Sequence, residues 1–370
     1  KMKIAQIAPL VESVPPRLYG GTERIVSYLT EELVTLGHDV TLFASGDSTT
    51  AATLASCVPK ALRLDASIRD PIPYYMLMLD WVRQRASEFD IFHFHIDQFH
   101  FPLFRPFAGR TVTTLHGRQD LPDLRPLYVG FDDMPLISIS EAQRRPIPNA
   151  NFAATIYHGL PLALHRPVER PQGSYLAFLG RISPEKRPDR AILIARALGI
   201  PLKIAAKVDR ADESYFRTQI EPLLDGPGVE FIGEINEEQK TRFLGEAQAL
   251  LFPVDWPEPF GLSMIEAMAC GTPVLAFRCG SVSEIVEDGI TGAIVDTLEQ
   301  AIAALPQVIA LDREKVRKRF EQRFSARRMA NDYVNVYRLL LAASQHIGSN
   351  GREARHDPVD GTHVLRPHVA

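Results

Sequence analysis

The chain has 370 residues, which is too long for one hydrophobic core of ordinary size and predicts two domains. A hydrophobic fraction of 45% with 23% charged residues is typical of a globular protein, and a net charge of −4 excludes a global attraction to nucleic acid or to an acidic membrane. The three cysteines, Cys57, Cys270 and Cys279, have no CxxC spacing, so a disulfide framework or a zinc site is not expected and a cytoplasmic location is.

Strand-like runs alternate with helical patterns in the first half of the chain. The opening run is of strand length, without the long apolar region of a signal peptide, and no apolar stretch reaches membrane-span length. Residues 22–37 show helical periodicity that ends at Gly37. Strands are expected at residues 2–9, 38–44, 90–95, 110–117 and 135–140. This alternation predicts βαβ units and a parallel sheet.

The same alternation restarts after the Pro-rich stretch 159–174. Further strands are expected at residues 175–180, 201–206, 229–233, 249–253, 273–277 and 292–295. The pattern therefore predicts an α/β protein of two Rossmann-like domains joined near residue 165.

The end of the chain has a different pattern. Residues 312–345 read as a long helical segment whose apolar stripe includes Tyr333 and Tyr337 and has to pack on other parts of the protein. Residues beyond it lack any periodicity. The predicted division is an N-terminal domain at 1–165, a C-terminal domain at 166–328, a crossover helix at 329–347 and an irregular tail at 348–370.

Polar loops that follow parallel strands are the places where ligands bind in such folds. After the first strand, Gly20 and Gly21 let the backbone approach a ligand, and Thr22 is a candidate cap for a helix whose N-terminus favours anions. The loop is neither a GxGxxG fingerprint nor a Walker A loop. An ordinary glycine turn into a helix is the alternative.

A second loop, GRISPEKRPD, follows the strand at 175–180. It carries Arg181 and Lys186 beside the start of a helix, with Ser183 in a capping position. Two cations at a helix N-terminus suit a phosphate or diphosphate. Solvated surface charge is the alternative.

A third stretch, PEPFGLSMIEAMACGTPV, contains Glu258 and Glu266. Ser263 and Glu266 fit the capping box S-x-x-E, so a purely structural role for Glu266 is open. Glu258 lies between two prolines and has no such explanation. Its carboxylate could accept hydrogen bonds from sugar hydroxyls.

Histidines gather in FHFHIDQFHF and LHG. His93 and His95 would share one face of a strand, but with His100 they lack convincing spacing for a zinc site, so no metal site is predicted. His116 comes at the carboxyl end of a strand, before a glycine, where a structural and a functional role are equally open.

Taken together, GGTE, LHG, GRISPEKRPD, FIGEI and the E-x7-E motif PEPFGLSMIEAMACGTPV resemble the retaining glycosyltransferases of family 4. The resemblance extends over roughly residues 2–340. It implies a GT-B fold, in which two Rossmann-like domains with parallel sheets face a cleft and a C-terminal helix crosses back to the N-terminal domain.

The same resemblance implies a role for individual residues. His116 would lie close to the transferred sugar, Arg181 and Lys186 would bind the diphosphate, and Glu258 would contact the donor sugar. Glu266 would hold the ribose. The remaining implied contacts are Gly20 and Gly21 across the cleft, Ile232 at the base, and the backbone at Phe260, Gly261, Leu262 and Ser263.

The activity implied by the family is transfer of a hexose, with UDP-glucose the preferred guess, from a nucleotide-diphosphate sugar to a hydroxyl of a saccharide or small-molecule acceptor. Cations and a helix dipole would stabilise the leaving diphosphate, so no cofactor or metal is expected, and the chain has no DxD motif. A carboxylate assigned to the ribose does not fit the two-carboxylate scheme of retaining hydrolases, so front-face transfer is the working hypothesis.

Several features depart from the family pattern. His158 stands where many relatives have Asn before Gly, and Lys207 where many have a glycine; Lys207 could meet phosphate or acceptor, or be solvated. Residues 45–75 contain no motif, so the acceptor and the oligomeric state stay open.

Other functions remain as alternatives. The chain lacks the pyridoxal lysine site of phosphorylases, and GT-B epimerases lack the E-x7-E pattern. A non-catalytic nucleotide-sugar-binding protein is another alternative. So is a lipid-directed transferase: residues 312–328 are basic, but acids are interspersed, so a solvated face is favoured over membrane contact.

Overall fold

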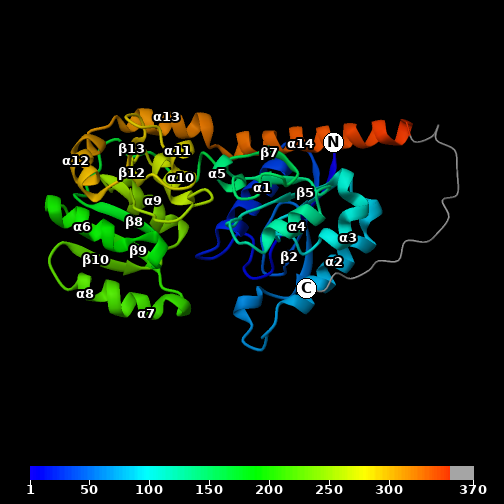
Figure 1. Cartoon of the computed structure of the whole chain (residues 1–370), viewed down its shortest axis with the longest axis horizontal. Helices are drawn as coiled ribbons and strands as arrows, with labels where there is room; N and C mark the ends of the chain where they lie inside the picture. Colours follow the sequence, from blue (N-terminus) through cyan, green and yellow to red (C-terminus); the bar gives the residue numbers. More distant parts are fainter. Residues whose placement is uncertain (351–370) are drawn as a thin grey trace, which may run out of the picture.

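The computed structural model describes residues 1–350 and consists of two α/β bodies side by side (Figure 1). Each body contains one parallel sheet with helices packed against it. The predicted tail from residue 348 lies outside the described residues except for 348–350, which are helical.

The N-terminal sheet has seven parallel strands in the order β3-β2-β1-β4-β5-β6-β7. The order reverses between β1 and β4, where Ile4 pairs with Ile91 on one side and with Val40 of β2 on the other. Its strands are β1 Lys3–Ile7, β2 Asp39–Ser45, β3 Thr53–Val58, β4 Ile91–Phe94, β5 Thr111–Thr114, β6 Leu136–Ser138 and β7 Phe152–Thr155.

The C-terminal sheet has six parallel strands in the order β10-β9-β8-β11-β12-β13. Its reversal point lies between β8 and β11, and ligands bind in such folds outside the carboxyl ends of the strands at this point. Its strands are β8 Leu176–Arg181, β9 Leu202–Lys207, β10 Val229–Gly233, β11 Ala249–Phe252, β12 Val274–Phe277 and β13 Gly292–Val295.

Helices connect the strands in both bodies. Those of the N-terminal body are α1 Gly21–Thr35, α2 Ile72–Gln84, α3 Phe101–Phe104, α4 Leu124–Gly130 and α5 Glu141–Arg144, with short η1 Leu62–Leu64, η2 Ala86–Glu88 and η3 Arg105–Arg110. Those of the C-terminal body are α6 Pro188–Leu198, α7 Glu213–Tyr215, α8 Glu221–Leu224, α9 Glu237–Gly245, α10 Leu262–Ala269, α11 Val282–Ile285 and α12 Leu298–Ile309, with short η4 Pro184–Lys186, η5 Arg210–Asp212 and η6 Phe216–Ile220. The last two helices are α13 Arg313–Arg323 and α14 Ala326–Asn350.

The chain crosses between the bodies twice, near residues 160 and 325, and backbone hydrogen bonds join the two crossings. The backbone N–H of Leu160 donates to the carbonyl of Phe324, and that of Ala326 donates to the carbonyl of Leu160. A Cβ at Gly159 would lie 2.2 Å from the carbonyl oxygen of Ser325, so only glycine permits this approach. α14 then runs along the N-terminal body (Figure 1) and contacts α1 and η3.

The predicted apolar stripe is buried on α14. Met329, Tyr333 and Tyr337 have no exposed surface, and Val336 is also buried. The single helical segment predicted from 312 to 345 was wrong, because the chain breaks at Phe324 and Ser325, where the backbone bonds of the crossing replace those of a helix.

The expected strands are confirmed, whereas β3 and α2 were not predicted. β3 is the edge strand of its sheet and four of its six residues are not buried, so its apolar pattern is weak. Among residues 1–350, we find no helix that combines the length and the hydropathy required to span a membrane.

Candidate functional site

A cavity of about 530 Å³ lies where the two bodies meet, outside the carboxyl ends of β8, β9 and β11. Both bodies contribute to its lining. The predicted site residues that line it are Gly20, Gly21, His116, Arg181, Lys186, Lys207, Glu258, Phe260, Gly261, Leu262, Ser263 and Glu266.

Ile232 is the one predicted site residue outside this lining. It lies on β10, the edge strand of the C-terminal sheet, and its side chain is 37% exposed. Glu234 and Ile235 line the cavity instead. The chain turns at Gly233, whose φ is +78°, so the following residues and not Ile232 face the cavity.

Lys186 and Glu258 form an ion pair inside the cavity. The Nζ of Lys186 lies 2.5 Å from Glu258 Oε2, which also accepts a hydrogen bond of 2.8 Å from Trp256 Nε1. The ammonium lies over the Trp256 ring, 5.0 Å from its centroid. The two groups expected to contact different parts of a ligand therefore contact each other in this structure.

The loop that carries Glu258 is held by the motif that follows it. The hydroxyl of Ser281 donates to the carbonyl of Phe260, and the Ser281 N–H donates to the carbonyl of Glu258. Gly280 has a φ of +56°, and a Cβ there would lie 2.3 Å from Glu258 N. Gly280 thus permits the backbone contact that places the Glu258 carboxylate.

Arg181 and Lys207 are surrounded by acids. Arg181 lies 2.7 Å from Glu185 and 3.5 Å from Asp212, and Lys207 lies 2.9 Å from Asp209. Arg181 ends β8 and Lys207 ends β9, and the two residues are paired in register. Two neighbouring strands thus deliver two cations to the same edge of the sheet.

The capping box predicted from Ser263 and Glu266 was wrong. α10 begins at Leu262, its N-cap is Gly261 with a φ of +88°, and no side chain caps it. A Cβ at Gly261 would lie 2.9 Å from the Phe252 ring, so glycine is required. The uncapped start of α10 lies on the cavity, where its dipole favours an anion.

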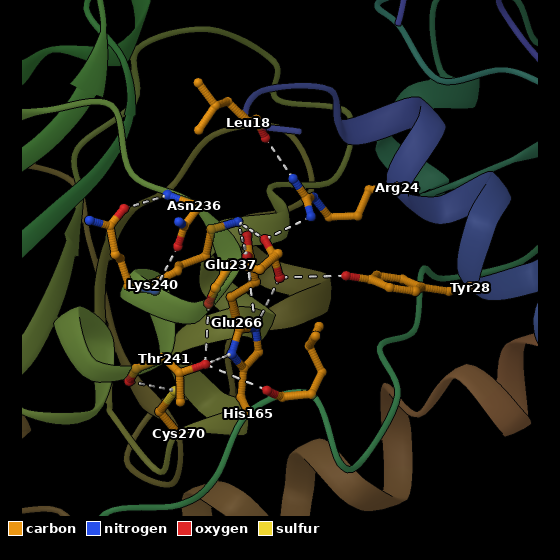
Figure 2. A network of polar contacts seen from close by, with 12 residues as sticks. Leu18, Arg24, Tyr28, His165, Asn236, Glu237, Lys240, Thr241, Glu266 and Cys270 are labelled. Carbon is orange, nitrogen blue, oxygen red and sulfur yellow. Dashed lines mark hydrogen bonds and ion pairs between the residues drawn. The ribbon is translucent and has the colours of Figure 1, made fainter. Parts of the chain in front are cut away.

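Glu266 belongs to a network of charges that joins the two bodies (Figure 2). Lys240 on α9 lies 2.6 Å from Glu266 and 2.5 Å from Glu237. Arg24, on α1 of the other body, lies 2.9 Å from Glu237. The carboxylate expected to bind a ribose is therefore linked through two side chains to the opposite wall of the cleft.

The same network contains a possible metal-ligand set. His165, Glu237 and Glu266 offer three ligand atoms within 4.8 Å of one another. However, Lys240 and Arg24 already pair with these two carboxylates. The balance of two cations against two carboxylates favours an ion-pair network over a metal site.

The start of α1 forms the opposite wall. A Cβ at Gly21 would lie 3.3 Å from Cδ1 of Leu262, so the two helix starts face each other closely across the cleft. Thr22 does not cap α1, contrary to prediction, because the N-cap is Gly20. Ser183 is the N-cap of η4 but makes no capping hydrogen bond.

Glu23, in the first turn of α1, is a cavity residue that the sequence analysis missed. Its side chain is buried, and burial, with the neighbouring charge of Glu12, raises its pKa to about 7. In the GGTE stretch that contains it, roles were predicted for the two glycines and Thr22 but not for Glu23. The cavity residues Trp256 and Lys240 and the neighbouring Glu237 were not predicted either. A readable signal exists only for the start of α9, where Asn236 and Gln239 form a capping box.

We expect the pKa of Glu23 to make stability depend on pH. The folded state holds this proton up to about pH 7, whereas the unfolded chain loses it near 4.5, so the free energy of unfolding should fall as pH rises through this window, by at most about 3 kcal/mol. Glu23→Gln should remove this contribution. Urea titrations of both proteins at pH 5 and pH 8 measure the difference. An exposed glutamate, in Glu299→Gln, is the control, and parallel pH dependences of Glu23→Gln and the unmodified chain would contradict the assignment.

His93, His95 and His100 do not come together as a set of metal ligands. His100 stacks on Phe94 at 3.7 Å and bonds to Thr113, on the opposite face of the sheet from His93 and His95. His95 instead bonds to His116, 2.9 Å from Nδ1 to Nε2. Burial lowers the pKa of His116 to about 3, so its ring is neutral at pH 7.

Two family models match the sequence, one in each half. Residues 19–181 match the model described as Glycosyltransferase Family 4, and residues 165–326 match the model described as Glycosyl transferases group 1. The two matches together extend over residues 19–326. The chain belongs to the family 4 glycosyltransferases.

Curated relatives within this family match the chain over part of their length. A D-inositol 3-phosphate glycosyltransferase of Saccharomonospora viridis is 32% identical over 192 residues, which is 45% of this chain and 43% of that protein. A GDP-mannose-dependent alpha-(1-6)-phosphatidylinositol dimannoside mannosyltransferase of Mycobacterium tuberculosis is 32% identical over 149 residues, 40% of this chain and 38% of the relative. These matches span less than half the length of the relatives.

Solved structures show that the family 4 chain has the GT-B fold. Sucrose-phosphate synthase from Thermosynechococcus elongatus superimposes with a TM-score of 0.77 at 19% identity, over 93% of this chain and all of the other. A glycosyltransferase involved in avilamycin A biosynthesis gives 0.70 at 24% identity, over 92% and 98%. HepE from Anabaena, solved with UDP-glucose, gives 0.65 at 17% identity, over 94% and 100%.

Proposed function

We propose that this chain is a retaining hexosyltransferase that moves a sugar from a nucleotide-diphosphate sugar to a hydroxyl acceptor. The observation that carries the proposal is the pair of Lys186 and Glu258 in a cavity that also receives Arg181 and the uncapped start of α10. This arrangement offers positive charge for a diphosphate beside a carboxylate for sugar hydroxyls.

The chemistry that these groups support is departure of a nucleoside diphosphate. When the bond between the anomeric carbon and the phosphate oxygen breaks, both electrons stay on that oxygen, and negative charge builds up on the diphosphate. Lys186, Arg181 and the dipole of α10 would stabilise this charge. Because these groups supply the positive charge, we propose that the reaction needs no metal ion.

Retention follows from the side of attack. The acceptor oxygen would bond to the anomeric carbon on the face that the diphosphate leaves, and its proton would pass to the departing phosphate oxygen. Glu266 would bind the ribose, so it would not serve as the nucleophile of a two-carboxylate scheme. NMR of the anomeric proton of the product tests the assignment, because an inverted linkage would exclude it.

The donor is proposed with support from relatives. The Anabaena protein is solved with UDP-glucose, and one mycobacterial relative is GDP-mannose-dependent. We take UDP-glucose as the first candidate and GDP-mannose as the second. A saccharide or small-molecule hydroxyl is proposed as acceptor.

A lipid acceptor at a membrane surface is the weaker alternative, since arginine side chains of the basic helix α13 are bonded within the protein. Its Arg313, Arg317 and Arg323 all donate hydrogen bonds to backbone carbonyls of the protein, and Arg319 pairs with Glu287. These side chains join α13 to the rest of the C-terminal body and are not arranged as a binding face for anionic lipid.

Thermal unfolding with UDP, GDP and ADP, each without added metal, tests the proposed donor site. A nucleotide present at about 100 times its Kd should stabilise the chain by roughly 2.7 kcal/mol. We expect one nucleotide to raise the Tm clearly above the other two. Turnover with the matching sugar nucleotide then tests catalysis; nucleotide binding without turnover would favour the non-catalytic alternative, and no shift with any nucleotide would overturn the donor site.

A further inference from the structure

A chain of hydrogen bonds lies behind His116, buried in the N-terminal sheet. His116 Nε2 lies 2.9 Å from His95 Nδ1, and His95 Nε2 lies 2.7 Å from Oε1 of Gln6. Gln6 has no exposed surface, and His95 is 3% exposed. Gln6 lies on β1, His95 directly follows β4, and His116 comes two residues after the end of β5, so neighbouring strands place the three side chains close together.

The direction of the hydrogen bonds in this chain determines where the protons are. An amide oxygen only accepts hydrogen bonds, so His95 Nε2 carries a proton and donates it to Gln6. The ring of His95 is neutral, because burial lowers its pKa well below the usual value. Its Nδ1 therefore has a free electron pair, and His116 Nε2 has to be the donor in the bond between the two rings.

The amide group of Gln6 also has a partner at its other end. Gln6 Nε2 donates to the hydroxyl of Tyr337 at 3.2 Å, and that hydroxyl lies 2.6 Å from His93 Nδ1. His93 Nε2 in turn lies 2.7 Å from the hydroxyl of Thr114. Gln6 Nε2 also lies 3.2 Å from His93 Nδ1, so the Tyr337 hydroxyl of α14 is one of two partners of this amide nitrogen.

We propose that Gln6 and His95 are positioning residues that hold His116 in the Nε2–H tautomer, so that its Nδ1 offers an electron pair to a hydroxyl of the bound sugar or acceptor. His116 lines the cavity, and among residues 1–350 its Nδ1 has no protein hydrogen-bond partner. The proposal rests on the proposed function, which supplies the hydroxyl. The tautomer itself is a property of the free protein and does not depend on turnover.

Long-range ¹H–¹⁵N correlation spectra of the whole chain labelled with ¹⁵N-histidine test the tautomer directly, since protonated and unprotonated ring nitrogens resonate far apart. We expect His116, assigned by the signal lost in His116→Gln, to be protonated at Nε2 and unprotonated at Nδ1. A proton on Nδ1 in the unmodified protein would overturn the proposal, whether or not the protein transfers sugar.

Variants separate positioning from packing. Gln6→Leu and His95→Phe each break the chain of hydrogen bonds, and both should give a mixture of His116 tautomers and lower kcat/KM with UDP-glucose by about tenfold to a hundredfold, with UDP binding unchanged. His95→Asn keeps an acceptor oxygen near the position of Nδ1 and should recover most of this loss.

The matched control is Tyr337→Phe, because Gln6 can still donate to His93 Nδ1 at 3.2 Å and keep its orientation. We expect this variant to keep the tautomer of His116. An unchanged tautomer in both Gln6→Leu and His95→Phe, or a mixture in Tyr337→Phe equal to theirs, would show that Gln6 and His95 do not set it. Absence of turnover in the unmodified protein would count against the proposed function, and the spectra would still decide the tautomer.

Discussion

Lys186→Ala is expected to lower kcat by a factor of about 10² to 10³, or roughly 3 to 4 kcal/mol of barrier, because it removes one preorganised cation from the site of the developing diphosphate charge. It should also weaken binding of the free nucleoside diphosphate. Among residues 1–350, the variant leaves the buried Glu258 carboxylate with the Trp256 N–H as its remaining donor. Isothermal titration with the nucleotide chosen by thermal shift, together with steady-state kinetics, measures both effects.

Glu258→Gln should separate the two halves of this pair. It keeps the size of the side chain and a hydrogen-bond acceptor, but it removes the charge that now holds Lys186. We expect a comparable loss of turnover with nucleoside diphosphate affinity kept or increased, because Lys186 is released toward the phosphates. Full activity of Glu258→Gln would remove Glu258 from the proposed site.

A matched lysine makes the comparison specific. Lys203 lies on β9, outside the cavity lining, and pairs with Glu230 at 3.8 Å. Lys203→Ala should change neither turnover nor nucleotide affinity. An equal loss of affinity in Lys203→Ala and Lys186→Ala would mean that overall charge, and not the position of Lys186, determines binding.

Arg313→Ala is expected to destabilise the protein by about 3 to 5 kcal/mol. The guanidinium donates to the backbone carbonyls of Val168, Gly245 and Ala247 and to the hydroxyl of Thr272, at 2.6 to 3.0 Å. The alanine side chain has no hydrogen-bond donor, so these buried acceptors would lose the donors that the guanidinium supplies. The bonds join the interdomain linker to the end of α9, so the loss should fall on the C-terminal body.

Urea unfolding followed by the fluorescence of Trp256 reports on that body, once the other tryptophan is replaced in a Trp81→Phe background. Arg278→Ala is the control, since Arg278 is exposed and pairs with the exposed Asp296. The control should change the free energy of unfolding by less than about 1 kcal/mol. A loss of that small size in Arg313→Ala would show that the bonds of the guanidinium contribute little.

Much of the fold could be predicted from periodicity. Short apolar runs separated by helical patterns require a parallel sheet, because parallel strands need crossover connections. β3 escaped prediction because an edge strand is only partly buried and its pattern is diluted. The break between α13 and α14 escaped prediction because a tertiary backbone bond, from Leu160 to Phe324, competes with the helix there.

The residues of the candidate site were predicted with less success than the strands. Residues at strand ends, such as Arg181 and Lys207, could be located because carboxyl ends of parallel strands meet at one edge. The role of Glu266 in its helix could not, since Ser263 and Glu266 satisfy a local capping rule that Gly261 and Lys240 override. Ile232 was carried over from a motif, but the turn at Gly233 directs the cavity lining to later residues.

By itself, the sequence determined the class of fold, the order of the two domains and the short list of chemically active loops, because these depend on local periodicity and on spacing along the chain. The tertiary structure alone decided which polar side chains meet. Lys186 with Glu258, Arg24 with Glu237, and Gln6 with His95 are separated by 72, 213 and 89 residues. The energy of an ion pair or hydrogen bond depends on distances of a few ångströms and on burial, and no local pattern encodes these.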